Sequence, residues 1–226
     1  MTAVVPESST AEKPVGRIRQ KNKAAIIKAA EEEFARHGFK GTSMNTIAQN
    51  VGLPKANLHY YFGNKLELYK AVLLNILELW DTAFDNITAQ DDPYEALSGF
   101  IRAKMEYARR HPKASRIYAM EVISGGEILA KMHGQDYRDW FRGRAAVFEA
   151  WQAAGKMDPI DPKHLIFLLW SSTQHYADFA SQISRVTGQS RMTKADFELA
   201  SDNLVHIILK GCGIKPPVNT DAVHPA

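Results

Sequence analysis

The chain has 226 residues, of which 45% are hydrophobic, with a formal net charge of +3 and one cysteine. This composition suits one or two globular domains with a sizeable core, and no apolar run reaches the roughly 20 residues that a membrane-spanning helix needs. A lone cysteine, Cys212, can form neither an internal disulfide nor, by itself, a structural zinc site. These features argue against a membrane protein and a disulfide scaffold. We expect a cytoplasmic protein that uses no metal, no cofactor and no membrane.

The basic charge is concentrated near the N-terminus. Residues 17–70 contain ten Lys or Arg and four Glu, a net charge of 10 − 4 = +6, whereas residues 71–226 contain 17 basic and 19 acidic groups, a net charge of 17 − 19 = −2. A basic segment of this size indicates a polyanion partner, although a basic solvated face would give the same count.

The chain begins with an arm, residues 1–16, that is polar, contains proline and has no periodicity, so we expect it to be disordered. Apolar residues at helical spacing then predict a first helix over residues 21–37. Gly38 ends this helix, because glycine adopts the backbone conformation that terminates helices at little cost.

Two shorter helices follow the first. Thr42 and Ser43 are good N-caps for a second helix over residues 44–51, which stops at Gly52. A third helix is expected over residues 54–61, because the fixed φ of its first residue, a proline, suits the first turn of a helix.

The rest of the chain also predicts helices, separated by Gly and Pro signals. No segment shows the period-two alternation of a strand, so we expect an all-α protein. The expected spans are 66–84, 94–110, 113–124, 127–154, 162–186 and 193–210.

The second and third helices, joined by a tight turn, are typical of a helix-turn-helix DNA reader. Leu58 and Phe62 would anchor the third helix, whose polar and aromatic side chains suit phosphates and base edges. Backbone N–H groups at the start of the second helix, and a lysine at the start of the fourth, could each hold a further phosphate. The alternative is the ordinary surface of a small helical subdomain. The candidate DNA-binding residues are Thr42, Ser43, Lys55, Asn57, His59, Tyr60 and Lys65.

The segment "FARHGFKGTSMNTIAQNVGLPKANLHYYFGNKLELYKAVL", Phe34 to Leu73, resembles the DNA-binding domain of the TetR family of transcriptional repressors. The turn "HGF", the cap "TS" and the following "IAQNVG", "YYF" and "NKLELY" carry the resemblance. Pro54 stands where many members have serine, which puts a hydroxyl contact to phosphate there in doubt.

This resemblance implies a homodimer in which each third helix enters the major groove of one half of a near-palindromic operator. It also implies pairing through the last two long helices, residues 162–186 and 193–210. Apolar residues there could form a four-helix seam or belong to the core of one chain. They are Leu199, Leu204, Ile207 and Ile208.

The sequence therefore predicts four segments. They are a disordered arm, a helix-turn-helix DNA-binding domain, a helical ligand-binding and dimerisation domain and a flexible tail, over residues 1–16, 17–64, 65–212 and 213–226.

The stretch "LLWSSTQHYADFAS", Leu168 to Ser181, is unusually polar for a helix that begins among apolar residues. Trp170 and Gln174 are one helical turn apart and can project into the same space. An indole offers a flat apolar face and an amide offers a donor and an acceptor, a pair that suits a small planar molecule with amide-like edges. The alternative is that the two side chains only satisfy each other within the core.

Residues 161–188, 66–80 and 111–125 resemble the pyrimidine-responsive members of the same family. That resemblance implies that uracil or thymine is the effector that releases the protein from its operator. It adds Trp80 and Tyr118 to Trp170 and Gln174 as effector-binding residues. The chain departs from these relatives along "SGGEILAKMHGQ", which leaves the recognised base open.

Two rival functions have weaker support. His175 and Asp178 are spaced so that they could share a metal, but no third ligand is near in sequence, so we expect no enzyme and no metal site. A lipophilic effector controlling an efflux operon is the second rival, and the polar edge of Gln174 argues against a purely apolar pocket.

Overall fold

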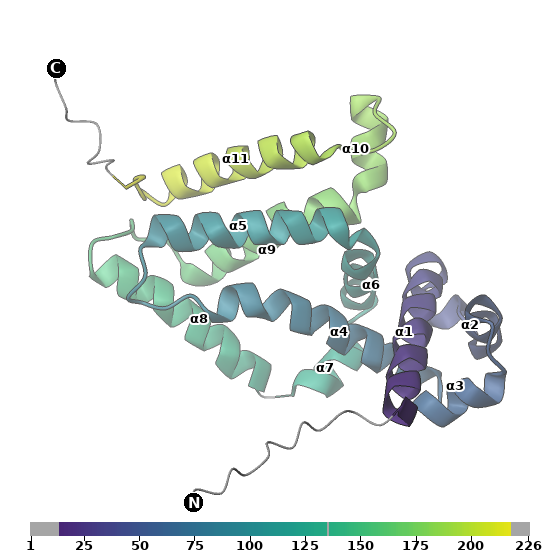
Figure 1. Cartoon of the computed structure of the whole chain (residues 1–226). Helices are drawn as coiled ribbons and strands as arrows, with labels where there is room; N and C mark the ends of the chain where they lie inside the picture. The colour runs from purple at the N-terminus through teal and green to yellow at the C-terminus, as the bar shows by residue number, and fades with distance from the viewer. Residues whose placement is uncertain (1–13, 135, 218–226) are drawn as a thin grey trace, which may run out of the picture. The chain divides into compact units, whose positions relative to one another are not determined.

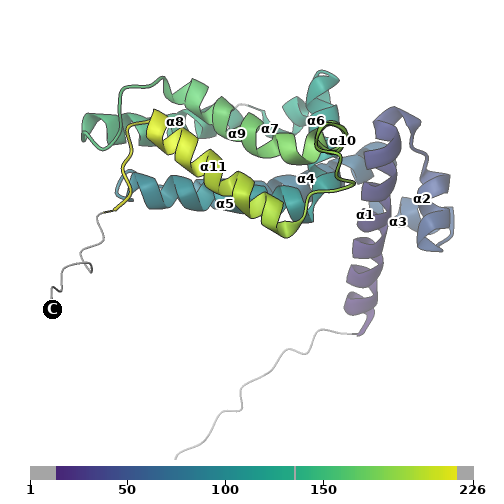
Figure 2. The same cartoon turned by 90° about the horizontal axis from the view of Figure 1, so that it is seen from above.

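The computed structural model describes residues 14–134 and 136–217, apart from the side chains of residues 14, 15, 79–83 and 133. Every regular element in these ranges is a helix, which confirms the all-α prediction (Figures 1 and 2). The helices are α1 (Pro14–Gly41), α2 (Met44–Val51), α3 (Lys55–Phe62), α4 (Lys65–Asp85), α5 (Pro93–Arg110), α6 (Pro112–Ile123), α7 (Glu127–His133), α8 (Asp136–Ala153), α9 (Pro162–Asp178), α10 (Ala180–Thr187) and α11 (Lys194–Gly211).

The chain forms two compact units that divide between Val72 and Leu73, eight residues after the expected boundary. The first unit contains α1 to α3 and the start of α4. Its core side chains are fully buried, and the rings of Phe34 and Tyr69 form a T-shaped pair with 4.8 Å between centroids. The core is formed by Ile26, Phe34, Ile47, Leu58 and Leu68.

Local signals set the boundaries of the short helices in this unit. Gly38 has φ 64°, in the region that favours glycine, and breaks the regular path of α1, which nevertheless continues to Gly41, beyond the end that the sequence predicts. Ser43 accepts a hydrogen bond from the N–H of Thr46 at 3.1 Å, and Gly52 in the left-handed conformation ends α2. Pro54 is the N-cap of α3 rather than its first helical residue.

The second unit is built on α5, α9 and α11, with α8 packed against α9. Figures 1 and 2 both show α11 running along α5. Buried residues on α5 recur at helical spacing and face a core in which Trp151 is fully buried. These α5 residues are Leu97, Phe100, Ile101, Lys104, Met105 and Ala108.

Two predicted helices are each divided in the structure. The single helix expected over residues 127–154 is α7 and α8, because Gly134 adopts φ 54° and ψ −140° between them. The helix expected over residues 162–186 is α9 and α10, because Phe179 leaves the helical region with φ −110° and ψ 25°. Three successive hydroxyl side chains in α9 bond to backbone carbonyls one turn earlier, an arrangement that bends helices.

The two ends of the chain contain more structure than expected. Residues 14–16 belong to α1, and Ile214 in the expected tail is buried, with its N–H bonded to the carbonyl of Leu209. The rest of the expected arm and tail, residues 1–13 and 218–226, lies outside the described residues.

Candidate nucleic-acid interface and ligand pocket

The exposed side of α3 carries three of the predicted DNA-binding side chains. Lys55, His59 and Tyr60 are exposed, Tyr60 by 70%, whereas Asn57 is half-buried. The helical repeat of 100° per residue accounts for this, because Asn57 points about 160° away from the direction of His59. Leu58 and Phe62 are buried and anchor α3, as the sequence predicts.

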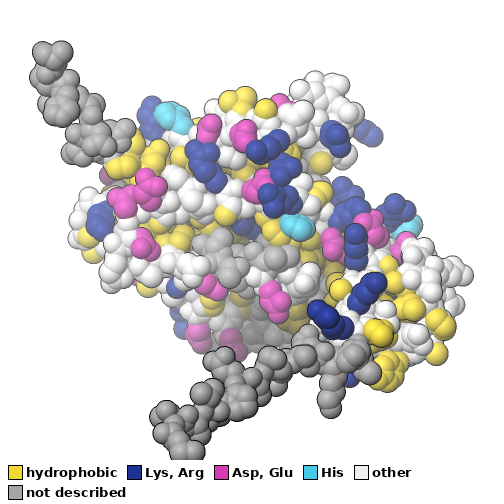
Figure 3. Space-filling view, in the orientation of Figure 1, with side chains coloured by type: hydrophobic (Ala, Val, Ile, Leu, Met, Phe, Trp, Pro, Cys, Tyr) yellow, Lys and Arg dark blue, Asp and Glu magenta, His cyan; other side chains and the backbone are white. Residues whose placement is uncertain are grey.

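The start of α1 lines α3 with cationic groups. The guanidinium of Arg19 lies 5.8 Å from the centre of the Tyr60 ring, and the ammonium of Lys23 lies 6.0 Å from the Phe62 ring. Asn22 donates a hydrogen bond to the Tyr61 hydroxyl at 3.1 Å. Figure 3 shows Lys and Arg side chains gathered over α1. This positive charge beside an exposed polar helix suits a phosphate backbone.

Thr42 and Lys65 have internal partners that the sequence did not predict. The buried Thr42 hydroxyl lies within bonding distance of the carbonyls of Glu33 (3.1 Å) and Gly38 (2.9 Å). The Lys65 ammonium donates to the carbonyls of Phe39 (2.8 Å) and Thr42 (3.0 Å) and lies 4.5 Å from the Phe39 ring centre. Lys65 therefore ties the start of α4 to the loop before α2, and Ser43 is the exposed residue of the predicted pair.

We expect Lys65→Met to destabilise the first unit, because two carbonyls lose a charged donor. Hydrogen bonds to charged groups contribute about 1.5–3 kcal/mol each, so the half-buried site should lose on the order of 2 kcal/mol. Chemical unfolding followed by circular dichroism measures this, with Lys40→Met, an exposed lysine in the last turn of α1, as the matched control. Equal stability of the two variants would contradict the bridging role.

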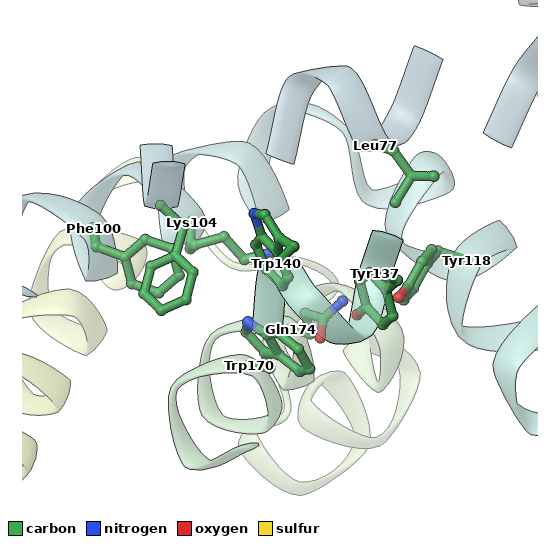
Figure 4. Close-up of a pocket in the computed structure, with 9 residues that line it drawn as sticks. Leu77, Phe100, Lys104, Tyr118, Tyr137, Trp140, Trp170 and Gln174 are labelled. Atoms are coloured by element: carbon green, nitrogen blue, oxygen red, sulfur yellow. The ribbon is translucent and has the colours of Figure 1, made fainter. Parts of the chain in front are cut away.

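A pocket in the second unit brings together three of the four predicted effector residues. Tyr118 from α6 and Trp170 and Gln174 from α9 all line it. Figure 4 shows Gln174 between Trp170 and Tyr137, with Tyr118 beyond Tyr137 and Phe100 on the opposite side of the pocket. The fourth, Trp80, lies in α4 with its side chain outside the described residues. The other lining residues are Leu77, Phe84, Phe100, Lys104, Tyr137 and Trp140.

Stacked aromatic rings fill much of this pocket. Trp140 lies nearly parallel to Trp170, with 6.3 Å between ring centroids and 14° between planes, and nearly parallel to Tyr137 at 5.5 Å and 9°. The cavity that the rings leave has a volume of about 40 Å³. That volume holds a few water molecules, so the pocket is narrow.

Polar groups meet the aromatic walls at a few points only. Gln174 is half-buried, and Lys104 of α5 is a buried cation with 7% of its surface exposed. Next to this region Asp178 accepts a hydrogen bond from Ser115 at 2.5 Å. Burial raises the pKa of Asp178, and the Ser115 hydroxyl and the charge of Lys104 oppose that rise. Few polar groups on mostly apolar walls are typical of sites for small molecules.

The polarity of α9 has two separate origins. The hydroxyls of Ser172 and Thr173 donate to the carbonyls of Leu168 and Leu169, both at 2.7 Å, and thus serve the helix itself. The exposed His175 stacks on Phe179 with 4.9 Å between centroids. Among the described residues no three His, Cys, Asp or Glu side chains gather as a metal site would require. Gln174 is the polar residue of this stretch that lines the pocket.

The pocket residues on α8 and α5 were not predicted from the sequence. Tyr137 and Trp140 are three residues apart, which is the spacing of neighbours on one helix face, and this aromatic pair was the available signal. Nothing in the sequence alone indicated that Lys104 would be buried beside them.

Comparison with known proteins relates both units to the same family. Residues 26–72 match the family described as bacterial regulatory proteins, tetR family, and residues 73–215 match the YcdC-like protein, C-terminal region. The junction of the two matches coincides with the division between the two compact units. No helix among the described residues is both long and apolar enough to cross a membrane.

Curated relatives extend over most of the chain. The HTH-type transcriptional regulator RutR of Escherichia coli K12 is 40% identical over 189 residues, which cover 84% of this chain and 89% of the relative. The HTH-type transcriptional repressor SCO4008 of Streptomyces coelicolor is 29% identical and covers 73% of this chain and 82% of the relative.

Solved structures share the fold at lower identity. AibR in complex with isovaleryl coenzyme A and operator DNA superposes with a TM-score of 0.66 at 21% identity, covering 82% of this chain and 97% of AibR. The regulator SCO4942 of Streptomyces coelicolor gives 0.67 at 21% identity, covering 86% and 99%. Together with the two family matches and the 40% identity to RutR, the fold and the helix-turn-helix lead to one conclusion. The chain belongs to the TetR family of DNA-binding transcriptional regulators.

Proposed function

We propose that this regulator represses genes of pyrimidine metabolism and is released from its operator by uracil or thymine. The observation that carries the proposal is the juxtaposition of Trp170, Gln174 and Tyr118 in one pocket of the second unit. The 40% identity to RutR over most of both chains supports the same proposal.

The chemistry of the pocket suits a pyrimidine base. Uracil is planar and alternates carbonyl and N–H groups along its edge. The Gln174 amide can pair with one C=O/N–H edge while the Trp170 ring stacks on the face. A buried polar edge left without a partner costs roughly 1–3 kcal/mol, which would select against rings that lack this pattern.

Operator recognition is assigned to α3 in two copies of the chain. Lys55, His59 and Tyr60 would face the major groove, with Ser43 and the start of α2 on a phosphate and Asn57 at the edge of the contact. Arg19 and its cationic neighbours on α1 lie beside α3 and would add backbone contacts.

The second copy would pair through α9, α10 and α11. Leu199 and Ile207 on α11 are 64% and 63% exposed, so both are available to a partner. Ile208 is buried in the core of its own unit and Leu204 is packed against it, so only half of the expected apolar stripe is free for a seam.

A lipophilic effector is the alternative, because most pocket-lining side chains are aromatic or aliphatic. A binding screen separates the two proposals. Isothermal titration calorimetry with uracil, thymine, cytosine and a hydrophobic cation should give heats of binding with uracil or thymine only, since cytosine presents a different donor and acceptor pattern. Heats of binding from the hydrophobic cation, with none from uracil or thymine, would reject the pyrimidine assignment.

A further inference from the structure

Trp140 closes the space in which a planar effector would stack. A ring needs about 3.5 Å of separation on each face, so two indoles that enclose a base must stand about 7 Å apart. The centroids of Trp140 and Trp170 are 6.3 Å apart and the planes differ by 14°. The two rings are therefore nearly parallel, and because the gap between their planes cannot exceed the distance between their centroids, the slot between them is too narrow for a base.

The two indoles are held differently. Trp170 lies within α9, which packs against α5, α6, α8 and α10, and the next turn is anchored by the fully buried Thr173. Trp140 lies near the start of α8, a few residues after Gly134, where the helical path of the chain is interrupted. A base that enters the slot would therefore displace Trp140 rather than Trp170.

Trp140 is also joined to the end of α4. Its indole N–H donates to the carboxylate of Asp85, the last residue of α4. One turn further along α8, Arg144 donates to the carbonyls of Phe84 (2.9 Å), Asp85 (3.0 Å) and Ile87 (3.0 Å). A carboxylate at the negative end of a helix is unfavourable, and the indole and the guanidinium offset it.

The opposite end of α4 belongs to the DNA-binding unit. Lys65, its first residue, bonds to the carbonyls of Phe39 and Thr42, directly before α2. One continuous helix thus links the Asp85 end to the helix-turn-helix unit through the chain.

We propose that Trp140 forms the second face of the effector slot and that its displacement is passed to α4 through the Trp140–Asp85 and Arg144 contacts. The inference rests on the proposed function, since it assumes a planar effector beside Trp170. It assigns two separable roles, stacking to the Trp140 ring and transmission to its N–H and to Arg144.

Substitutions at Trp140 separate the two roles. Trp140→Leu removes the stacking face and should weaken uracil binding, measured by calorimetry, by about tenfold or more. Trp140→Phe keeps a ring but has no N–H donor, so the affinity for uracil should stay within about threefold of wild type. The coupling between uracil binding and operator affinity should fall. Coupling is the ratio of operator dissociation constants with and without saturating uracil, measured by fluorescence anisotropy on an operator selected from random-sequence DNA.

Substitutions at Arg144 test only the transmission from Trp140 to α4. Arg144→Met should leave uracil affinity within about threefold but reduce the coupling by about fivefold or more, whereas Arg144→Lys should restore part of it. Arg142→Met, an exposed arginine on the same helix, is the matched control and should behave as wild type. Thermal unfolding by circular dichroism establishes that each variant is folded, and Arg144→Lys carries the test if Arg144→Met is not.

The outcomes distinguish this inference from the proposed function. If the wild type binds neither uracil nor thymine, the proposed function fails and the inference fails with it. If the wild type binds and Trp140→Leu binds equally well, the stacking role is wrong while the proposed function stands. Full coupling in the folded Arg144 variants would overturn the transmission role in the same way.

Discussion

Lys55→Ala is expected to weaken operator affinity by about two to four orders of magnitude. A hydrogen bond to a charged group contributes about 1.5–3 kcal/mol, and a dimer loses two of them, one in each half-site. Lys55 is exposed at the start of α3, next to the concave surface formed with Asn45 and Gln49 of α2, so little in the protein should change when it is removed. Anisotropy on the selected operator measures the loss.

The salt dependence identifies the kind of contact. If each Lys55 contacts a phosphate, removing the two contacts should make the slope of log affinity against log salt shallower by about 1.8, whereas a clearly smaller change would indicate that Lys55 contacts a base edge. Tyr60→Ala should lower affinity for the operator with little change in slope, because its exposed ring carries no charge. Lys194→Ala in α11, which removes an exposed lysine from the second unit, is the control. If it weakens binding as much as Lys55→Ala, α3 is not the reading helix.

Gln174→Ala is expected to weaken pyrimidine binding by about 5-fold to 150-fold. The substitution leaves one C=O/N–H edge of the base without a partner, at a cost of roughly 1–3 kcal/mol. The same variant should bind its operator as the wild type does, because Gln174 lines the pocket of the second unit. As a consequence, far more uracil should be needed to release the DNA.

Trp170→Ala should weaken binding further, because the stacking face is lost together with the apolar contact. Gln182→Ala, an exposed glutamine in α10, is the matched control and should leave the affinity unchanged. Wild-type affinity for uracil in the folded Gln174→Ala variant would show that this amide does not read the base.

The sequence predicts the DNA-binding unit well because its boundaries depend on local chemistry. The cap at Ser43 and the turn glycine at Gly52 determine where α2 begins and ends, and both are visible in a few residues. The internal partners of Thr42 and Lys65 depend on α1 and α4 meeting in space, so a phosphate contact and a structural bridge look alike in the sequence. A structural bridge is distinguished from a phosphate contact by the burial of its side chain, which local sequence patterns do not show.

Helix geometry predicts the pocket only along α9, whereas Tyr118 of α6 was predicted from the family resemblance. Trp170 and Gln174 are one turn apart on α9, and their shared direction follows from helix geometry. Tyr137 and Trp140 reach the same space only because Gly134 ends α7 and lets α8 take another direction. The expected continuous helix over residues 127–154 would have placed them differently, so the second aromatic wall required the tertiary structure.

Release of operator DNA by a free base is the direct test of the proposed effector. The protein bound to its selected operator is titrated with uracil and with thymine while fluorescence anisotropy reports the bound fraction. We expect at least one of the two bases to lower operator affinity by a factor of about 5–150, and we expect Gln174→Ala to move the titration to higher concentrations of base. Operator binding that neither base changes, at concentrations saturating by calorimetry, would contradict this expectation.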